Sequence, residues 1–457
     1  MKSLDVRIWG IRLDKRAKNP MYELRWRVAG EVFHERFRTK GLVDTFRAKL
    51  VTATKDGEPF DTESGLPASM EKKTSPLTWY EFACAYAAAK WPFASANHRD
   101  SISETLTGAT LAMLADRPGR PDAAVLRAAL RGWAFIPAER WPDQPTEVAN
   151  ALHWVGRSSR PVADLAEPAA MRALLDALAL RQDGRRAAAE TVRRKRSVLY
   201  GALTRAVELR ALTEHPIDAI KVAGAKVNKQ VDRRVVVNPK QARELLIAVS
   251  YVGGYSRARG RRLVAMFACM YYAGLRPAEA VGLLRTDCTL PKKGWGVIVL
   301  HKTRPTAGKR WTDSGDTHDA RGLKNRAEEE TRRIPIPPVL VKHLRRHLRD
   351  FPGAKDGRVF GNERGDLVGS STYSRAWQEA RELALTPEQA ASPLAGTPYD
   401  LRHAALSTWL NAGMDPPEVA QRAGNSVDVL MSRYAKCLDG RDEINNQKIE
   451  KLLRGKH

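Results

Sequence analysis

The 457-residue sequence is poor in cysteine, in long apolar runs and, relative to its basic residues, in acidic ones. Its four cysteines are widely scattered and show no paired metal-ligand spacing, which argues against a disulfide framework or a zinc site. No apolar run approaches the roughly 18 residues of a membrane-spanning helix, and the N-terminus lacks the apolar core of a signal peptide. We therefore expect a cytoplasmic protein with reduced cysteines, no metal and no membrane partner.

The shortage of acidic residues leaves a strongly basic chain. There are 77 lysines and arginines against 52 acidic residues, for a formal net charge of +25. This excess attracts polyanions, of which nucleic acid is the usual one and a membrane surface is the rival. The length predicts two or three domains, each able to bury a core without covalent links.

Residues 1–70 predict a small α+β sheet domain. The stretch 22–28 alternates between apolar and charged side chains, as a half-buried strand does. Arg25 and Arg27 fall on its outer face, either as a solvated surface or as a DNA contact. The stretch 56–76, rich in glycine, proline, serine and threonine, has the composition of a linker.

Residues 76–225 predict a mainly helical domain. It begins at Thr78, which forms a capping-box pattern with Glu81, and we expect its last helix over 185–212. That helix contains a basic cluster that suits a solvated face and a phosphate contact equally well. The cluster consists of Arg193, Arg194, Lys195 and Arg196. The basic segment 224–234 that follows is the predicted interdomain hinge.

Residues 232–457 predict a third domain, mostly helical with a small sheet. Strands are expected over 294–301 and 332–337, with a long polar excursion between them. Near the C-terminus, a helix is expected over 404–413, ending at a glycine suited to a left-handed cap. Tyr434 falls on a later helix. The predicted fold class is thus multidomain and mainly α.

Three motifs of this last domain occur in a telling order. They are Gly274-Leu-Arg-Pro-Ala-Glu279, then Asp400-Leu-Arg-His403, then Tyr434. Each piece alone is unspecific, but the ordered set, with a strand pair between the arginines, resembles the tyrosine recombinase (phage integrase) family. The motifs cover about 230–440. Residues 1–225 resemble the family only in architecture, as an arm-binding sheet domain and a helical, SAM-like core-binding domain.

The resemblance implies a site-specific integrase of a bacterial mobile element or phage. Tyr434 would attack a DNA phosphodiester, form a 3'-phosphotyrosyl bond and expel a 5'-hydroxyl. Arg276 and Arg402 would grip the non-bridging oxygens, since planar guanidiniums bind phosphate bidentately and oppose the charge of the five-coordinate phosphorus. Because the tyrosyl link conserves bond energy, rejoining needs no cofactor, ATP or metal.

Two positions depart from the family pattern. Tyr399 stands where the family most often has histidine, and Asn425 where it has histidine or tryptophan. Both can donate a hydrogen bond to a phosphate oxygen, but neither is a good proton shuttle near neutral pH. The family's leaving-group acid is a lysine on the strand pair, which we assign to Lys324 in preference to Lys302.

Glu279, Asp400 and His403 are predicted to support this site, with Glu279 and Asp400 holding the arginines. Each assignment has a structural alternative. Tyr434 could be an aromatic side chain packed in a helix, and Arg276 could be an ion-pair partner of Glu279. Arg402 could be a buried arginine paired with Asp400.

The resemblance also implies partners: double-stranded DNA attachment sites, further copies of the chain in a homotetramer on DNA, and factors that set direction or bend DNA. An apolar stripe in the tail is expected to dock on a neighbouring subunit. It consists of Ile444, Ile449, Leu452 and Leu453. Two other functions stay open, namely a DNA-binding protein of this fold with weakened catalysis and a type IB topoisomerase.

Overall fold

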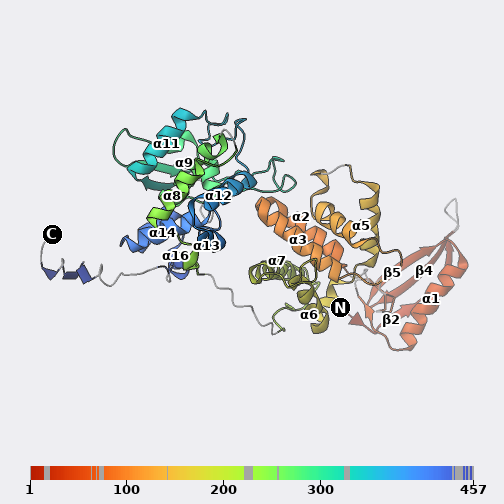
Figure 1. Cartoon of the computed structure of the whole chain (residues 1–457). Helices are drawn as coiled ribbons and strands as arrows, with labels where there is room; N and C mark the ends of the chain where they lie inside the picture. Colours follow the sequence, from red (N-terminus) through yellow and green to blue (C-terminus); the bar gives the residue numbers. More distant parts are fainter. Residues whose placement is uncertain are drawn as a thin grey trace.

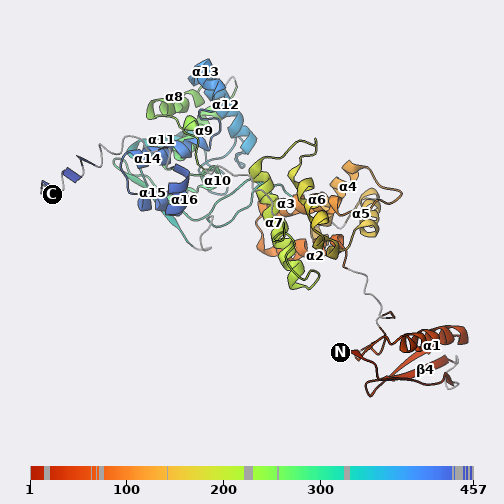
Figure 2. The ribbon, with the colours of Figure 1, turned by 90° about the horizontal axis from the view of Figure 1, so that it is seen from below.

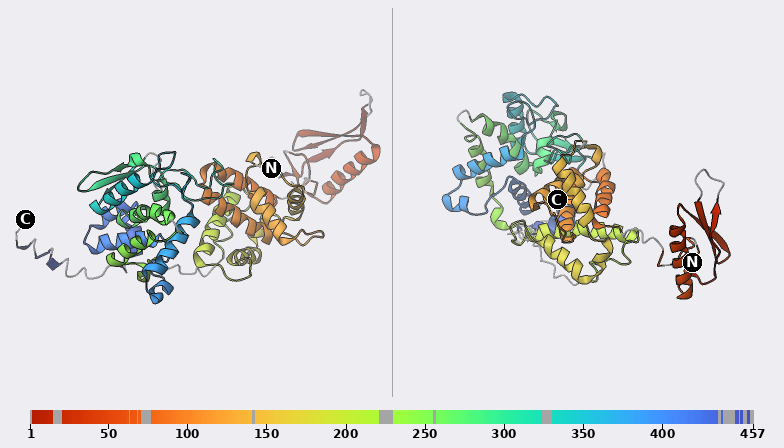
Figure 3. Two further views of the ribbon diagram at one scale, coloured as in Figure 1. Left: turned by 45° about the horizontal axis from the view of Figure 1, so that its top comes forward. Right: turned by 90° about the vertical axis from the view of Figure 1, so that its right-hand side faces the viewer.

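The structure is a computed structural model, and three units follow one another along the chain (Figure 1). The N-terminal sheet unit stands apart from the other two (Figures 2 and 3). The residues described are 2–14, 21–62, 64–67, 69–70, 77–140, 143–220, 230–254, 257–323, 330–434, 437, 446–447, 449–450 and 453–454. Within these ranges, no helix is long and apolar enough to cross a membrane. The fold is multidomain and mainly α, with small sheets, as predicted.

The N-terminal unit is a sheet covered by one helix. Its central strand β4 pairs with β5 along one edge and with β2 and β3 along the other. Leu24, Trp26 and Val28 of β4 are buried as predicted, but the prediction was wrong for Glu23, which is only 5% exposed on the opposite face. The elements are β1 (Lys2–Ser3), β2 (Val6–Ile8), β3 (Arg12–Asp14), β4 (Met21–Val28), β5 (Glu31–Phe37), α1 (Lys40–Lys55) and β6 (Phe60–Asp61).

The linker prediction for 56–76 was wrong in its first part. Strand β6 pairs with β1, and Phe60 is fully buried in the apolar cluster of the sheet unit. The turn-forming residues there build a short hairpin-like return to the sheet, which composition alone does not distinguish from a linker. Residues 71–76 lie outside the described ranges.

The middle unit is a helical bundle around one apolar cluster. The predicted capping box is confirmed, because the Thr78 hydroxyl accepts from the Glu81 amide at 3.3 Å and the Glu81 carboxylate accepts from the Thr78 amide at 3.2 Å. The long basic helix is shorter than predicted. The helices are α2 (Trp79–Lys90), α3 (Ala96–Ala112), α4 (Ala123–Ala129), α5 (Thr146–Ser158), α6 (Pro168–Ala179) and α7 (Ala189–Glu208).

The C-terminal unit surrounds the buried helix α9 with further helices and a three-stranded antiparallel sheet of order β7-β8-β9. The predicted strand pair is confirmed. So is the left-handed helix end at Gly413, whose φ is +82°. The elements are α8 (Pro239–Val249), α9 (Ala258–Tyr272), α10 (Pro277–Gly282), β7 (Cys288–Thr289), β8 (Gly296–Leu300), β9 (Arg332–Ile336), α11 (Pro338–Asp350), α12 (Ser370–Ala384), α13 (Pro387–Ala391), α14 (Asp400–Asn411), α15 (Pro416–Ala423) and α16 (Val427–Tyr434).

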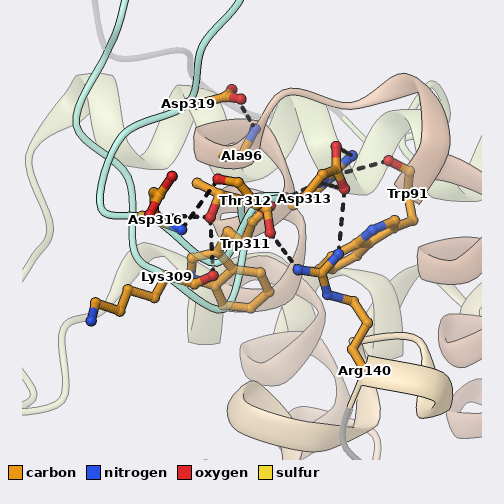
Figure 4. A network of polar contacts seen from close by, with 11 residues as sticks. Trp91, Ala96, Arg140, Lys309, Trp311, Thr312, Asp313, Asp316 and Asp319 are labelled. Carbon is orange, nitrogen blue, oxygen red and sulfur yellow. Dashed lines mark hydrogen bonds and ion pairs between the residues drawn. The ribbon is translucent and has the colours of Figure 1, made fainter. Parts of the chain in front are cut away.

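The polar excursion that follows β8 reaches across to the helical unit (Figure 4). There Trp311 packs near Trp91, with ring centroids 6.1 Å apart. Arg99, only 6% exposed, donates to the Trp311 carbonyl at 2.8 Å and binds Asp313 bidentately at 2.7 and 3.1 Å. Arg140 adds a second ion pair to Asp313 at 3.4 Å. We call these five residues the interdomain joint.

Two sequence predictions fall mainly outside the described residues. Of the hinge 224–234, the stretch 224–229 is not described. Of the tail stripe, Ile444 and Leu452 are not described, while Ile449 and Leu453 are exposed.

Candidate active site

The turn between α9 and α10 places Arg276 at the start of a helix. Gly274 has a φ of +61°, and a Cβ there would lie 3.0 Å from the Leu406 and Trp409 side chains, so the turn needs glycine. Pro277 occupies the first turn of α10, where a missing N–H costs nothing. The Arg276 amide donates to the Glu279 carboxylate at 2.8 Å.

Glu279 lies at the centre of the site and is 2% exposed. It accepts from the Arg276 guanidinium at 2.7 Å and, bidentately, from Arg332 at 2.9 and 2.7 Å. Arg402 approaches the same carboxylate to 4.0 Å. Burial alone would raise the pKa of Glu279, but the three arginines lower it to about 2. We call this group of four residues the arginine cluster.

Arg402 is 1% exposed and lies in the first turn of α14. Its guanidinium donates to the Ala423 carbonyl at 2.6 Å and also to the Gly274 carbonyl. Burial, together with the nearby Arg276, lowers the pKa of Arg402 to about 10. Three cations share one carboxylate here, so the arginine cluster holds an excess of positive charge.

Asn425 connects two of these arginines. Its amide oxygen accepts from Arg276 at 2.9 Å and from Arg402 at 3.4 Å. With the oxygen committed to the arginines, the amide nitrogen is the end that can donate to an anion. Asn425 does not cap α16, since the Ser426 hydroxyl accepts from the Val429 amide at 3.2 Å at that helix start.

Tyr434 ends α16 and is 2% exposed. Its hydroxyl lies 2.7 Å from Nδ1 of His403, which stands one residue after Arg402. Burial raises the pKa of Tyr434 above its ordinary value, against the opposing influence of Arg402. Burial and the charge of Arg402 lower the pKa of His403 to about 4, so this imidazole is neutral at pH 7.

Tyr399 and Asp400 differ in their relation to the arginines. The Tyr399 hydroxyl forms a hydrogen bond with the Arg276 side chain. Burial lowers the pKa of Arg276, but Glu279 and Tyr399 together outweigh burial, so the pKa of this arginine is raised. Within the described residues, Asp400 forms no ion pair with Arg276 or Arg402, which it was predicted to hold, and an arginine that acts on its carboxylate is Arg381. Its carboxylate accepts from the amide and hydroxyl of Thr397 at 2.7 and 3.1 Å, so it fixes the turn that leads into α14.

Arg332 is the site residue that sequence reasoning missed. It opens β9 and is 2% exposed, on the same face as the buried Ile334 and Ile336. The period-two alternation of 332–336 was the available signal, because it places the first arginine on the inner face. A Cβ at Gly424 would lie 2.3 Å from the Arg332 guanidinium, so the glycine lets the end of α15 approach β9 closely.

Of the two candidate lysines, Lys324 lies outside the described residues, and Lys302 is exposed just after β8. In the sheet unit, Arg25 pairs with Glu23 at 3.0 Å and Arg27 approaches Asp5 to 3.9 Å.

The four basic residues of α7 are not equivalent. Arg193 pairs with Glu190 at 2.5 Å, and Lys195 is 13% exposed and lies 3.8 Å from Glu104. Arg194 is exposed and Arg196 is half-buried. Of the cluster, Arg194 is therefore the side chain best placed to meet a ligand from solvent.

Residues 235–440 match the model of the phage integrase family. The described site residues of that segment are Arg276, Arg332, Arg402, Asn425 and Tyr434. Among curated proteins, the tyrosine recombinase XerC of Rhodospirillum centenum (strain ATCC 51521 / SW) is 26% identical over 177 residues, which are 38% of this chain and 42% of that protein. The chain thus matches less than half the length of this relative.

The solved structures to which the chain is similar include three DNA complexes. The Tn1549 transposon integrase with a circular intermediate DNA is 15% identical, with a TM-score of 0.47 over 70% of this chain and 99% of that one. XerH recombinase bound to a palindromic difH substrate is 12% identical, with a TM-score of 0.49 over 84% of this chain and 99% of that one. A lambda integrase dimer on a COC' core site is 13% identical, with a TM-score of 0.48 over 94% of this chain and 95% of that one.

Proposed function

We propose that this protein is a site-specific DNA recombinase, an integrase that cuts and rejoins DNA through a 3'-phosphotyrosyl intermediate. The observation that carries the proposal is the arginine cluster, where three buried or half-buried guanidiniums share the carboxylate of Glu279 close to the Tyr434 hydroxyl. A buried excess of positive charge is costly unless an anion balances it. A DNA phosphate supplies that anion, and its charge grows as phosphorus becomes five-coordinate.

In the reaction, the Tyr434 oxygen forms a bond to phosphorus and the bond from phosphorus to the 5'-oxygen breaks. Arg276 and Arg402 bind the non-bridging oxygens, and Asn425 and Tyr399 each donate one hydrogen bond to the same phosphate. Lys324 protonates the departing 5'-oxygen. Reversal on a second 5'-hydroxyl joins the exchanged strands without ATP or metal.

Arg332 and Glu279 orient the Arg276 guanidinium and do not contact the phosphate themselves. The bidentate Arg332–Glu279 pair at 2.7–2.9 Å fixes the carboxylate, and the carboxylate in turn fixes the Arg276 guanidinium at 2.7 Å. A guanidinium held in this way is already oriented when the phosphate arrives, so little reorganisation is needed in the transition state.

The proposed partners follow from the same chemistry. Double-stranded attachment sites bind the C-terminal unit, the basic side chains of α7 and, at accessory sites, Arg25 and Arg27 of the sheet unit. Exchange between two sites requires four active subunits, so we propose a homotetramer on DNA in which the tail contacts a neighbour, with accessory factors setting direction. Since the proposed substrate is the DNA of a mobile element or phage, we propose that the protein acts at the bacterial nucleoid in the cytoplasm.

A covalent trapping assay tests the proposal. The substrate is a duplex of the flanking DNA of the protein's own element, nicked so that the expelled strand diffuses away. Wild-type protein should accumulate a covalent complex, with or without EDTA. Tyr434→Phe should bind this DNA and trap none, while the matched control Tyr373→Phe, on α12 in the same unit, should trap normally.

The outcomes separate the three functions. DNA binding without trapping by wild-type protein would indicate a binding protein of this fold. Trapping and supercoil relaxation without any need for a second site would indicate a topoisomerase. Loss of trapping in EDTA would contradict the metal-free mechanism.

A further inference from the structure

The nucleophile of the proposed reaction has one close hydrogen-bond partner of a basic type. Nδ1 of His403 lies 2.7 Å from the Tyr434 hydroxyl, and the ring centroids are 5.7 Å apart. His403 lies on α14 and Tyr434 at the end of α16. The contact therefore depends on how the last helices of the C-terminal unit pack, and both side chains are held by that packing.

A phenol must lose its proton as its oxygen attacks phosphorus. The acceptor must lie within hydrogen-bond reach and must be unprotonated beforehand. Among the residues that the structure describes, the other titratable groups that act on the Tyr434 hydroxyl are Tyr399, Arg402, Arg433 and Cys437. Two of these are cations and two are weak acids, so His403 is the base among them.

We propose that His403 is a catalytic residue that accepts the proton of Tyr434 at Nδ1 during strand cleavage. The inference rests on the proposed function and adds a residue to it. The O–H bond of Tyr434 breaks and an N–H bond forms on His403, while the O–P bond forms and the 5'-oxygen departs. In strand joining, the imidazolium returns this proton to the departing phenol oxygen.

The charge distribution makes this base respond to substrate. Arg402 and Arg433 face His403, and burial and the charge of Arg402 lower its pKa to about 4. A bound phosphate neutralises the field of Arg402, which raises the basicity of the imidazole at the moment when the proton must move. The neutral histidine is thus in place before DNA binds and becomes a better acceptor once it has bound.

A merely structural role for His403 predicts a different response to substitution. In His403→Asn, the amide oxygen replaces Nδ1 as an acceptor of the Tyr434 hydrogen bond, so the orientation of the phenol is kept. An amide does not take up a proton near neutral pH. If His403 only orients Tyr434, this variant should cleave at nearly the wild-type rate.

The experiment is a single-turnover cleavage assay of the full chain on a substrate whose departing 5'-oxygen is replaced by sulfur. Sulfur leaves without protonation, so the pH dependence reports the nucleophile. The wild-type rate should rise with pH and level off once His403 is unprotonated in the complex. His403→Asn should be slower by about 10²- to 10⁴-fold, and its rate should keep rising with pH because the phenol must ionise by itself.

The control is His343→Asn. His343 also lies beside a tyrosine ring in this unit, 6.3 Å from Tyr272, and its substitution should leave rate and pH profile unchanged. A His403→Asn variant that folds, binds DNA and cleaves within about threefold of wild type, or keeps the wild-type pH profile, would overturn the inference. Absence of covalent complex with wild-type protein would instead overturn the proposed function itself.

Discussion

The interdomain joint and the arginine cluster both use a buried arginine with a carboxylate, but they differ in balance. In the joint, Arg99 donates to the carbonyls of Trp91 and Trp311 at 3.0 and 2.8 Å and pairs bidentately with Asp313. Its guanidinium also lies 4.6 Å from the centre of the Trp91 ring. In the cluster, the single carboxylate of Glu279 serves three guanidiniums.

This difference in charge balance distinguishes a structural contact, the joint, from a candidate anion-binding site, the cluster. Every donor edge of Arg99 has a partner, so the joint gains rigidity and has nothing left for a ligand. The cluster remains positively charged after its internal pairing, which costs stability, and in the proposed function an incoming phosphate removes that cost. Sites that break local charge balance in this way are where function is expected.

Arg402→Lys should have the largest effect on chemistry. The lysine keeps the charge but cannot reproduce the planar, bidentate donor set. We expect cleavage to fall by at least about 10²- to 10³-fold, the range for loss of one preorganised donor, with DNA binding retained. A suicide-substrate assay measures this. Near-normal cleavage would mean that the positive charge alone is sufficient and that the geometry of the cluster is irrelevant.

Substitutions at Asn425 test whether the arginine cluster is completed by neutral hydrogen-bond donors to the phosphate. If its amide nitrogen donates to the phosphate, Asn425→Ala and Tyr399→Phe should each lose about 10- to 1,000-fold in cleavage. Asn425→Asp should be severely impaired because it sets a negative charge against the phosphate, whereas Asn425→His should be tolerated. An active Asn425→Asp variant would remove Asn425 from the catalytic donors.

Arg99→Met should affect the joint and leave the chemistry alone. Loss of charge-assisted hydrogen bonds of this type costs about 1.5–3 kcal/mol each. The helical and C-terminal units should therefore separate more readily, which protease nicking within 301–323 would detect. Asp313→Asn should do the same more weakly. Cleavage of a bound suicide substrate as slow as that of Arg402→Lys would show that the joint takes part in catalysis.

Removal of residues 1–70 should have the smallest effect. The basic strand face around Arg25 is partly neutralised by Glu23, and the sheet unit stands apart from the C-terminal unit (Figure 2). Binding to an isolated core site should stay within a few-fold, while binding to longer DNA with accessory sites should weaken. Equal affinity of the two proteins for every DNA tested would mean that the sheet unit does not bind DNA.

The features that the sequence predicted correctly are those that depend on residues close together in the chain. The capping box at Thr78, the alternation around Trp26 and the glycine end at Gly413 each depend on neighbours within a few residues. For such features, the physical cause and the sequence signal coincide. The ordered motifs similarly led to the arginines at 276 and 402, which the structure brings to one carboxylate.

Contacts between distant segments escaped prediction. Arg332 meets Glu279 across 53 positions, and Arg99 meets the Trp311 carbonyl across 212. No periodicity encodes such a pairing, because it depends on how whole elements pack. The error at Asp400 has a different cause, because its partner Thr397 lies only three residues away and this local turn uses the carboxylate that was assigned to an arginine.

The most direct test of the account is to identify the residue that carries the DNA. Wild-type protein is trapped on the nicked suicide substrate, digested with protease and nuclease, and analysed by mass spectrometry. We predict a nucleotide joined through its 3'-phosphate to the peptide that contains Tyr434. A nucleotide on any other residue, or DNA cut with no nucleotide on the protein, would contradict it.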